Sequence, residues 1–227
     1  GYNHINVDAA KLAGIVVTNT PGAVTDATAD IALTLMLMTC RRAGEGERLL
    51  RANNWSGWHP TQLLGMHMTG KTLGIIGMGR VGQAFAKKAR GFDMEIHYFN
   101  RTKLSSDLSF GAIYHSSIES LLEVSDFLSL HCPSTPETYL LMNEIRLNLM
   151  PMGSIIVNTA RGSLIDEKAL INALQLGQIS AAGLDCYQDE PGGNPEFSKF
   201  NNIFMLPHIG SATVKTRDAM GFRALNN

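Results

Sequence analysis

The sequence of 227 residues has few cysteines, little net charge and no apolar run long enough for a membrane span. Its three cysteines, Cys40, Cys132 and Cys186, lie far apart in apolar segments. They therefore predict buried free thiols and a reducing, cytoplasmic environment rather than a disulfide framework. A formal net charge of −1 without a long basic stretch argues against nucleic acid as a partner. The longest strongly apolar run, 31–40, is too short to cross a bilayer, so we expect no membrane partner.

The sequence shows no pattern typical of a metal site or of a hydrolase active site. Most of the histidines show no metal-ligand spacing, so we expect no metal site; these are His4, His59, His67, His97 and His115. Neither a G-x-S-x-G motif nor a Cys–His arrangement indicates a hydrolase.

Short apolar strands alternate with helices along most of the chain. Helices are expected at 7–13, 25–41, 80–90, 143–150, 166–176 and 214–225, and strands at 15–17, 72–76, 94–99, 127–131, 154–158, 181–186 and 203–206. Thr25 and Asp26 are expected to cap the long second helix, Gly91 to end the third, and Ser116 with Glu119 has capping-box spacing. The alternation predicts an α/β fold of the Rossmann type, a doubly wound parallel sheet with helices on both faces. Ligands bind such sheets beyond the carboxyl ends of the strands, so the residues after each strand are the candidates for function.

The motif G-x-G-x-x-G occupies residues 77–82, directly after the strand 72–76 and at the start of a helix. Gly77 permits the tight turn, Gly79 lets a pyrophosphate approach the backbone, and Gly82 lets the helix pack close to the strand. Free N–H groups at the helix start, at Arg80 and Val81, would face the phosphates. In this strand–turn–helix setting, the motif predicts dinucleotide binding rather than a plain glycine-rich turn.

The end of the following strand indicates which dinucleotide is bound. An NAD enzyme usually has an acidic residue there, but this sequence has Asn100, followed by Arg101 and Thr102. Neutral Asn100 would not repel a 2′-phosphate, and Arg101 could pair with one through charge-assisted hydrogen bonds. The pattern therefore favours NADP(H), with NAD(H) as the alternative if Arg101 is simply an exposed loop residue.

A further strand ends at His131 and is followed by Cys132 and Pro133. We expect this segment to line the adenine side of the cofactor site, and a purely structural role is an equal alternative for His131.

Three other strand ends carry side chains suited to ketone reduction. Arg161 follows the strand 154–158, Glu190 follows 181–186, and His208 follows 203–206. Besides a hydride donor, the reaction needs a proton donor and a cation that binds the substrate carboxylate. We expect His208 to protonate the carbonyl oxygen, Glu190 to orient the imidazole ring, and Arg161 to bind the carboxylate bidentately. Taken singly, each residue has a structural alternative: a core histidine, a surface carboxylate or a structural arginine. The occurrence of all three at successive strand ends is a poor match for coincidence and favours the catalytic interpretation.

These segments together resemble the D-isomer-specific 2-hydroxyacid dehydrogenase family over essentially the whole chain. The resemblance rests on Asn19-Thr20-Pro21-Gly22, on 77–82, on Asn158-Thr159-Ala160-Arg161-Gly162, on 182–185 with Glu190-Pro191, and on Pro207-His208-Ile209-Gly210-Ser211. Within the family, the chain is most similar to the glyoxylate/hydroxypyruvate reductase branch, because of Trp55-Ser56-Gly57-Trp58 and Asn100-Arg101-Thr102.

The resemblance implies the same catalytic set and adds further cofactor, substrate and subunit contacts. It places Thr28 and Asp185 beside the nicotinamide, and puts more cofactor contacts at Thr159, Ala160 and Gly210. It implies a homodimer built partly on the helix 25–41, in which Trp58 reaches into the partner's substrate pocket. Gly1 would hold the substrate carboxylate through its backbone.

In this family a substrate domain precedes the dinucleotide-binding domain, and nearly all of it would lie before Gly1. We expect residues 1–19 to be a remnant of that domain with the hinge, 20–210 to be the NAD(P)-binding domain, and 211–227 to be a shortened helix that returns towards the substrate domain.

The predicted function is reduction of glyoxylate or hydroxypyruvate to the D-2-hydroxy acid. Two alternatives stay open: a dehydrogenase of phosphoglycerate or a bulkier 2-hydroxy acid, and a non-enzymatic dinucleotide sensor like the corepressors similar to this family.

Overall fold

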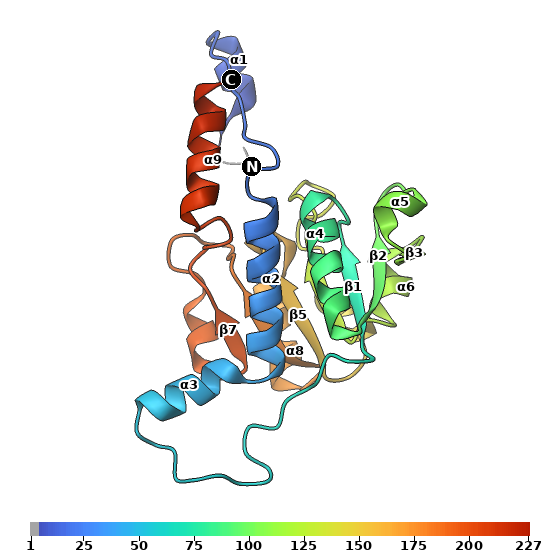
Figure 1. Ribbon diagram of the computed structural model, residues 1–227, viewed down its shortest axis with the longest axis vertical. Helices are drawn as coiled ribbons and strands as arrows, with labels where there is room; N and C mark the ends of the chain where they lie inside the picture. Colours follow the sequence, from blue (N-terminus) through green and yellow to red (C-terminus); the bar gives the residue numbers. More distant parts are fainter. Residues whose placement is uncertain (1–4) are drawn as a thin grey trace.

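The computed structural model describes residues 5–227 and is built around one parallel sheet (Figure 1). Its seven strands are ordered β3-β2-β1-β4-β5-β6-β7. They are β1 (Thr72–Ile76), β2 (Glu95–Phe99), β3 (Ile113–His115), β4 (Phe127–Leu130), β5 (Ser154–Asn158), β6 (Ile179–Leu184) and β7 (Ile203–Met205). The first strand, β1, lies in the interior of the sheet; the chain then adds β2 and β3 on one side of it and returns to add β4 to β7 on the other side. This order confirms the expected Rossmann-type, doubly wound sheet.

Helices cover both faces of the sheet. α2 (Thr25–Cys40) and α4 (Arg80–Ala89) pack on one face, and α6 (Ile118–Leu122), α7 (Glu144–Leu149) and α8 (Glu167–Gln175) pack on the other. Neighbouring strand residues face opposite layers, as in β4, where Phe127 joins the α2–α4 layer and Leu128 joins the other. Burial on both faces explains why the strands read as continuous apolar runs. Among the described residues, no helix has both the length and the apolar character that a membrane span needs.

The shorter elements lie around this core. They are α1 (Val7–Leu12), α3 (Ala43–Arg51), α5 (Ser106–Ser109), α9 (Val214–Leu225), and the 3-10 turns η1 (Arg90–Phe92), η2 (Gly162–Leu164) and η3 (Pro195–Lys199). Of these elements, α1 and α9 were expected from the sequence, whereas α3 and α5 were not. The edge strand β3 was not expected either.

Two expected elements differ from the structure. No strand forms at 15–17, where Ile15 and Val16 are exposed and pair with no strand of the described chain. β6 begins and ends two residues before the expected segment 181–186, because its pairing with β5 and β7 sets its register.

Three expected helix ends also differ. α2 has no side-chain cap, because Val24 occupies the capping position before Thr25. Ser117, rather than Ser116, caps α6 by accepting the Ser120 N–H at 3.2 Å. After α4 the chain continues through η1, and Asp93 adopts the left-handed conformation (φ 54°) where Gly91 had been expected to end the helix.

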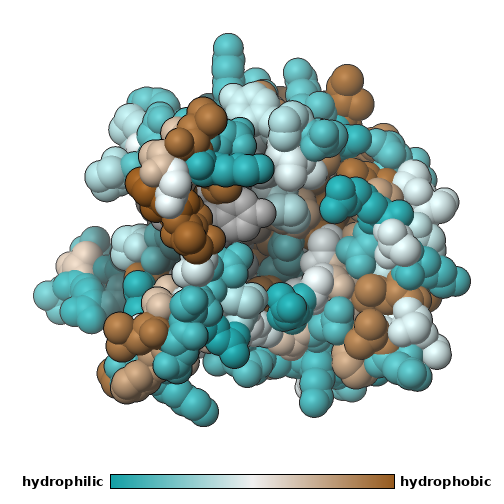
Figure 2. Space-filling view, turned by 90° about the horizontal axis from the view of Figure 1, so that it is seen from above, coloured by the Kyte–Doolittle hydropathy of each residue, from teal (hydrophilic) through white to brown (hydrophobic). Residues whose placement is uncertain are grey.

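The two ends of the described chain project together beyond the sheet. α1 and α9 lie at the same end of the molecule (Figure 1), where Asn227 Nδ2 donates to the Asn19 carbonyl at 2.9 Å and Arg223 donates to that of Pro21. α9 follows the carboxyl end of β7, and all seven strands are parallel. The end of the molecule that carries α1 and α9 is therefore also the end at which the carboxyl ends of the strands lie. Seen from this side, apolar residues gather at one edge of a hollowed face (Figure 2). Exposed apolar side chains on these projecting segments include Leu12 and Leu225.

Candidate active site

The three glycines of the 77–82 turn serve different steric purposes. A Cβ on Gly77, which has φ of +96°, would lie 2.5 Å from the Cys132 backbone nitrogen, and one on Gly82 would lie 2.5 Å from the Gly77 carbonyl oxygen. A Cβ on Gly79 would meet nothing within 4 Å. Gly77 and Gly82 are therefore required by close packing, whereas Gly79 leaves an open cradle at the start of α4. This cradle and the free N–H groups beside it fit a dinucleotide pyrophosphate. Arg80 is exposed and Val81 partly buried beside it.

The end of β2 contacts the same turn. Asn100 Oδ1 accepts the backbone N–H of Met78 at 2.7 Å, so this side chain supports the glycine turn. Arg101 and Thr102 are exposed beyond it. A hydrogen bond from Thr135 lowers the pKa of Glu137, and the positive charge of Arg101 lowers it further. Arg101 therefore lies near an exposed carboxylate on the loop after β4.

The segment after β4 forms the wall behind Gly77. His131 Nε2 lies 2.9 Å from Ser129 Oγ, and its ring packs on Phe85 with centroids 5.2 Å apart. Burial lowers the pKa of His131 to about 3, so the ring is neutral. Burial also raises the pKa of the Cys132 thiol to about 11, and Pro133 is exposed. The contacts of His131 are therefore those of a packed structural residue.

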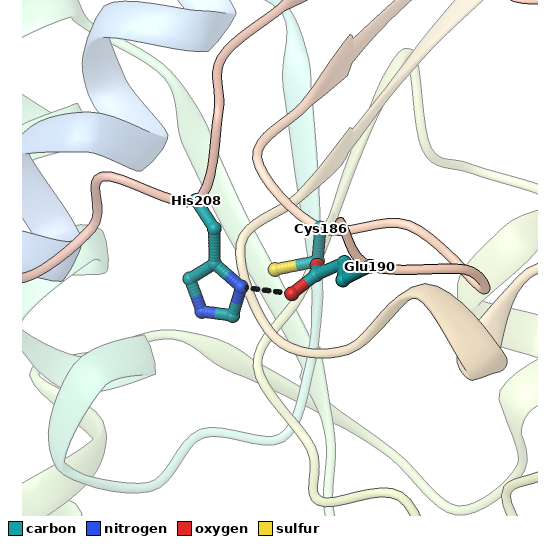
Figure 3. A group of neighbouring side chains, drawn as sticks. All are labelled: Cys186, Glu190 and His208. Carbon is teal, nitrogen blue, oxygen red and sulfur yellow. Dashed lines mark hydrogen bonds and ion pairs between the residues drawn. The ribbon is translucent and has the colours of Figure 1, made fainter. Parts of the chain in front are cut away.

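His208 and Glu190 form the central contact of the site (Figure 3). His208 Nδ1 lies 2.6 Å from Glu190 Oε2, and the other oxygen of Glu190 accepts the Tyr187 N–H at 3.0 Å. The His208 side chain is 47% exposed and that of Glu190 34%, so the pair faces solvent. His208 also has φ of +53°, a left-handed conformation that is uncommon for a non-glycine residue.

Asp185 holds the backbone after His208. Asp185 is 1% exposed, and its carboxylate accepts the N–H groups of Ile209 and Gly210, each at 2.8 Å. Burial raises the pKa of Asp185, while these two hydrogen bonds oppose the increase. Thr28 Oγ1 donates to the Gly210 carbonyl at 3.3 Å. Thr28, Asp185 and Gly210 therefore form one hydrogen-bonded group that positions His208.

Asn158 holds the turn that carries Arg161. Its amide is fully buried, donating to the Arg161 carbonyl at 2.8 Å and accepting the Ala160 N–H at 3.0 Å. Burial and the nearby Asp185 and Glu190 carboxylates raise the pKa of Cys186 to about 12, and the positive charge of Arg161 opposes this increase, so the guanidinium lies within electrostatic range of the end of β6. Thr159 Oγ1 is buried without a hydrogen-bond partner in the described part of the chain. The structure thus brings Arg161 towards the strand end that carries the Glu190 loop.

Two positioning residues were missed in the sequence. Asn158 is a polar residue at the end of an otherwise apolar strand, which is the signal that could have identified it. Tyr187 donates its hydroxyl to the Leu206 carbonyl at 2.8 Å and so ties the loop after β6 to the end of β7. No local pattern marks that contact.

Two predicted substrate residues do not join this group. Trp58 is 77% exposed on the long segment between α3 and β1, which extends from the end of the molecule opposite α1 and α9 (Figure 1). It therefore contributes nothing to the site of its own chain. Gly1 lies outside the described residues.

A family model described as "D-isomer specific 2-hydroxyacid dehydrogenase, NAD binding domain" matches residues 33–210. The chain belongs to this family. The glycerate dehydrogenase of Hyphomicrobium methylovorum is 47% identical over 226 residues, covering 99% of this chain and 70% of the relative. The glyoxylate reductase of Thermococcus litoralis is 48% identical over 225 residues, covering 97% of this chain and 68% of the relative. Such relatives support D-2-hydroxyacid dehydrogenase activity.

Solved structures of family members show the same fold. A putative D-isomer specific 2-hydroxyacid dehydrogenase from Polaromonas sp. has a TM-score of 0.94 at 48% identity, covering all of this chain and 73% of that one. An NADPH-dependent glyoxylate/hydroxypyruvate reductase from Sinorhizobium meliloti, in complex with NADP and malonate, has a TM-score of 0.89 at 37% identity, covering 98% of this chain and 69% of that one.

Proposed function

We propose that this protein reduces hydroxypyruvate to the D-2-hydroxy acid and glyoxylate to the achiral glycolate, with NADPH preferred over NADH. The observation that carries the proposal is the 2.6 Å contact between His208 Nδ1 and Glu190, at the edge of the sheet where the glycine turn opens. Relatives named glyoxylate reductase support the choice of substrate.

In this proposal His208 is the proton donor. Glu190 accepts the Nδ1 proton and fixes the ring, which leaves Nε2 for the carbonyl oxygen of the substrate. Nε2 has no protein hydrogen-bond partner within residues 5–227, and the ring is about half exposed. Asp185 and Thr28 keep the ring in place by holding the following peptide groups.

Arg161 binds the substrate carboxylate in this proposal. Its guanidinium offers paired N–H groups that match a carboxylate, and its charge stabilises negative charge that develops on the carbonyl oxygen. Asn158 supports this role by fixing the backbone on which the side chain is mounted. The bound nicotinamide would supply the hydride, and Gly79 with the start of α4 would hold its pyrophosphate.

The preference for NADPH rests on the end of β2. Asn100 offers no carboxylate that would repel a 2′-phosphate, and its side chain is already bonded to the glycine turn. Arg101 is exposed and free to reach a phosphate, in competition with nearby Glu137. The NADP complex of the Sinorhizobium meliloti relative agrees with this choice.

The subunit and domain organisation is part of the same proposal. Trp58 lies on a projecting, exposed segment, as a residue that enters a partner's site would. On α2 the apolar side chains of Ile31, Leu33 and Leu37 pack against the core but stay only partly buried, which suits further burial in a homodimer contact. We also propose residues 1–19 as a remnant of a substrate domain with its hinge, and 211–227 as a shortened helix that returns towards that domain, since Asn227 donates to the Asn19 carbonyl. The three free thiols suit a cytoplasmic enzyme.

Steady-state rates of the full chain test the proposal. The substrates would be glyoxylate, hydroxypyruvate, its 3-phosphate and phenylglyoxylate, each with NADPH and with NADH. We expect the highest kcat/KM for the two small acids with NADPH. Equal or better turnover of the phosphorylated or aromatic acid would reject the substrate assignment. Cofactor binding without turnover of any acid would favour a dinucleotide sensor.

A further inference from the structure

The acid pair has a third neighbour, the thiol of Cys186. One ligand atom each from Cys186, Glu190 and His208 lies within 4.8 Å of the other two. In Figure 3 the sulfur points from the end of β6 towards the imidazole and the carboxylate. The reductase chemistry proposed above gives Cys186 no role. A thiol, a carboxylate and an imidazole in one group are nevertheless a ligand set for a transition metal.

We propose that Cys186, Glu190 and His208 bind a Zn²⁺ ion and that this ion inhibits the enzyme. Binding of the ion follows from the geometry alone, whereas inhibition rests on the proposed function of the acid pair. The expectation of no metal site came from the spacing of other histidines, and the fold brings these three ligands together from separate loops.

The chemistry of the three ligands selects zinc. Zn²⁺ takes thiolate at about 2.3 Å, imidazole at about 2.0–2.1 Å and carboxylate at about 2.0–2.2 Å. Ligand atoms around such a tetrahedral ion lie about 3.5 Å apart. The pair at 2.6 Å must therefore separate slightly while the sulfur approaches. A thiolate ligand disfavours Mg²⁺ and Ca²⁺, and three protein ligands leave a fourth position for water.

Charge and access decide whether an ion can enter. Glu190 and nearby Asp185 favour a dication, whereas Arg161 opposes it. Glu190 and His208 are exposed, so an ion can reach them from solvent before it contacts the buried Cys186. Binding releases the thiol proton to solvent. If Nδ1 is the ligating nitrogen, its proton moves to Nε2 or to solvent, because the ring coordinates in its unprotonated form.

The ion would remove the proton donor from the reaction. The carboxylate and the imidazole nitrogen that now contact each other would both be metal ligands. A metal-bound imidazole cannot take up the second proton that an acid catalyst needs. The glycine turn lies at another part of the sheet edge, between β1 and α4, so dinucleotide affinity should remain.

Direct binding tests the site. Chelator-treated full chain would be titrated with Zn²⁺ against a fluorescent zinc indicator, for the native sequence, for Cys186→Val and for the control Cys40→Ala. We expect one ion per chain, an affinity at least about tenfold weaker in Cys186→Val, and no change in Cys40→Ala. Co²⁺ should give a thiolate-to-metal charge-transfer band in the native protein and in Cys40→Ala only. Equal zinc affinity in Cys186→Val, or the band in that variant, would overturn the site.

Turnover separates this proposal from the function it depends on. Each variant would be compared with its own zinc-free rate. Zinc should inhibit the native enzyme and Cys40→Ala reversibly, with activity restored by EDTA, while Cys186→Val should require at least about tenfold more zinc. Binding that depends on Cys186 in a protein without turnover rejects the proposed function but keeps the site. An active enzyme whose inhibition does not depend on Cys186 rejects the inhibitory site but keeps the function.

Discussion

The two halves of the sheet edge are built in different ways. Around β1 and α4, the cofactor cradle is made of backbone: three glycines and the free N–H groups of a helix start. Around β5, β6 and β7, the site is made of side chains that come from three separate loops. Those side chains depend on supporting residues behind them, namely the buried Asn158 and Asp185 and the partly buried Tyr187.

The two halves differ in what holds their atoms in position. The cradle is contiguous in sequence, so six residues set its shape through local conformation and steric room. The acid pair joins residues 18 positions apart in the chain, Glu190 and His208, so long-range packing must hold both loops. The left-handed conformation of His208 is maintained by such packing. Substitutions in the two halves should therefore separate cofactor binding from catalysis.

The largest separation is expected from His208→Asn. Asn tolerates the left-handed conformation but cannot donate the required proton, so kcat should fall about 10²- to 10⁴-fold. The Kd for NADPH, measured by fluorescence titration, should stay unchanged. His67→Asn, at an exposed position outside the site, is the control. Unchanged turnover in His208→Asn would refute the acid assignment.

A matched pair of glycine substitutions divides the cradle itself. In Gly79→Ala the new methyl group meets only open space, so Tm should be unchanged while the Kd for NADPH rises at least about tenfold. In Gly82→Ala it would lie 2.5 Å from the Gly77 carbonyl oxygen, so the free energy of unfolding should fall by about 1–3 kcal/mol. Calorimetry and cofactor titration of both variants would measure this. An equal decrease in Tm in Gly79→Ala and Gly82→Ala would contradict the inference that only Gly82 is required by close packing.

A smaller effect is expected from Arg101→Ala. Losing a charge-assisted contact to the 2′-phosphate should weaken NADPH about 10- to 100-fold and leave NADH nearly unchanged. Kd values for both nucleotides would be compared with those of Lys103→Ala, which removes a nearby exposed cation. Equal losses for the two nucleotides would contradict the 2′-phosphate role.

The smallest effect concerns the packed His131. Its pKa of about 3 lies below the ordinary value of 6.5, so the unfolded chain takes up a proton first as the pH falls. The neutral His131 ring therefore contributes to the free energy of unfolding above pH 6.5. This contribution is lost on acidification towards pH 3, and the free energy of unfolding then falls by at most about 1.4 kcal/mol per pH unit. In His131→Phe, which keeps a ring against Phe85, the decrease in Tm between pH 6.5 and 4.5 should become shallower. In the control, His67→Ala, it should stay as in the native protein.

The sequence alone determined the fold class, most of the sheet and the cofactor cradle. Each of these depends on local information: apolar periodicity, and glycines between a strand and a helix. Six of the seven strands were anticipated, and the edge strand β3 was missed because its three residues, which include His115, are not fully buried. The expected strand at 15–17 failed for the converse reason, since apolar residues form a strand only beside a partner.

Tertiary structure alone decided how the candidate active site is assembled. The sequence suggested that Arg161, Glu190 and His208 end neighbouring strands, but the distance between Glu190 and His208 depends on how two loops fold over β6 and β7. Asn158 and Asp185 act through hydrogen bonds whose geometry exists only after the sheet has formed. The approach of Cys186 to the acid pair could not be read from spacing, because it depends on the register of β6 and on the path of two loops at once.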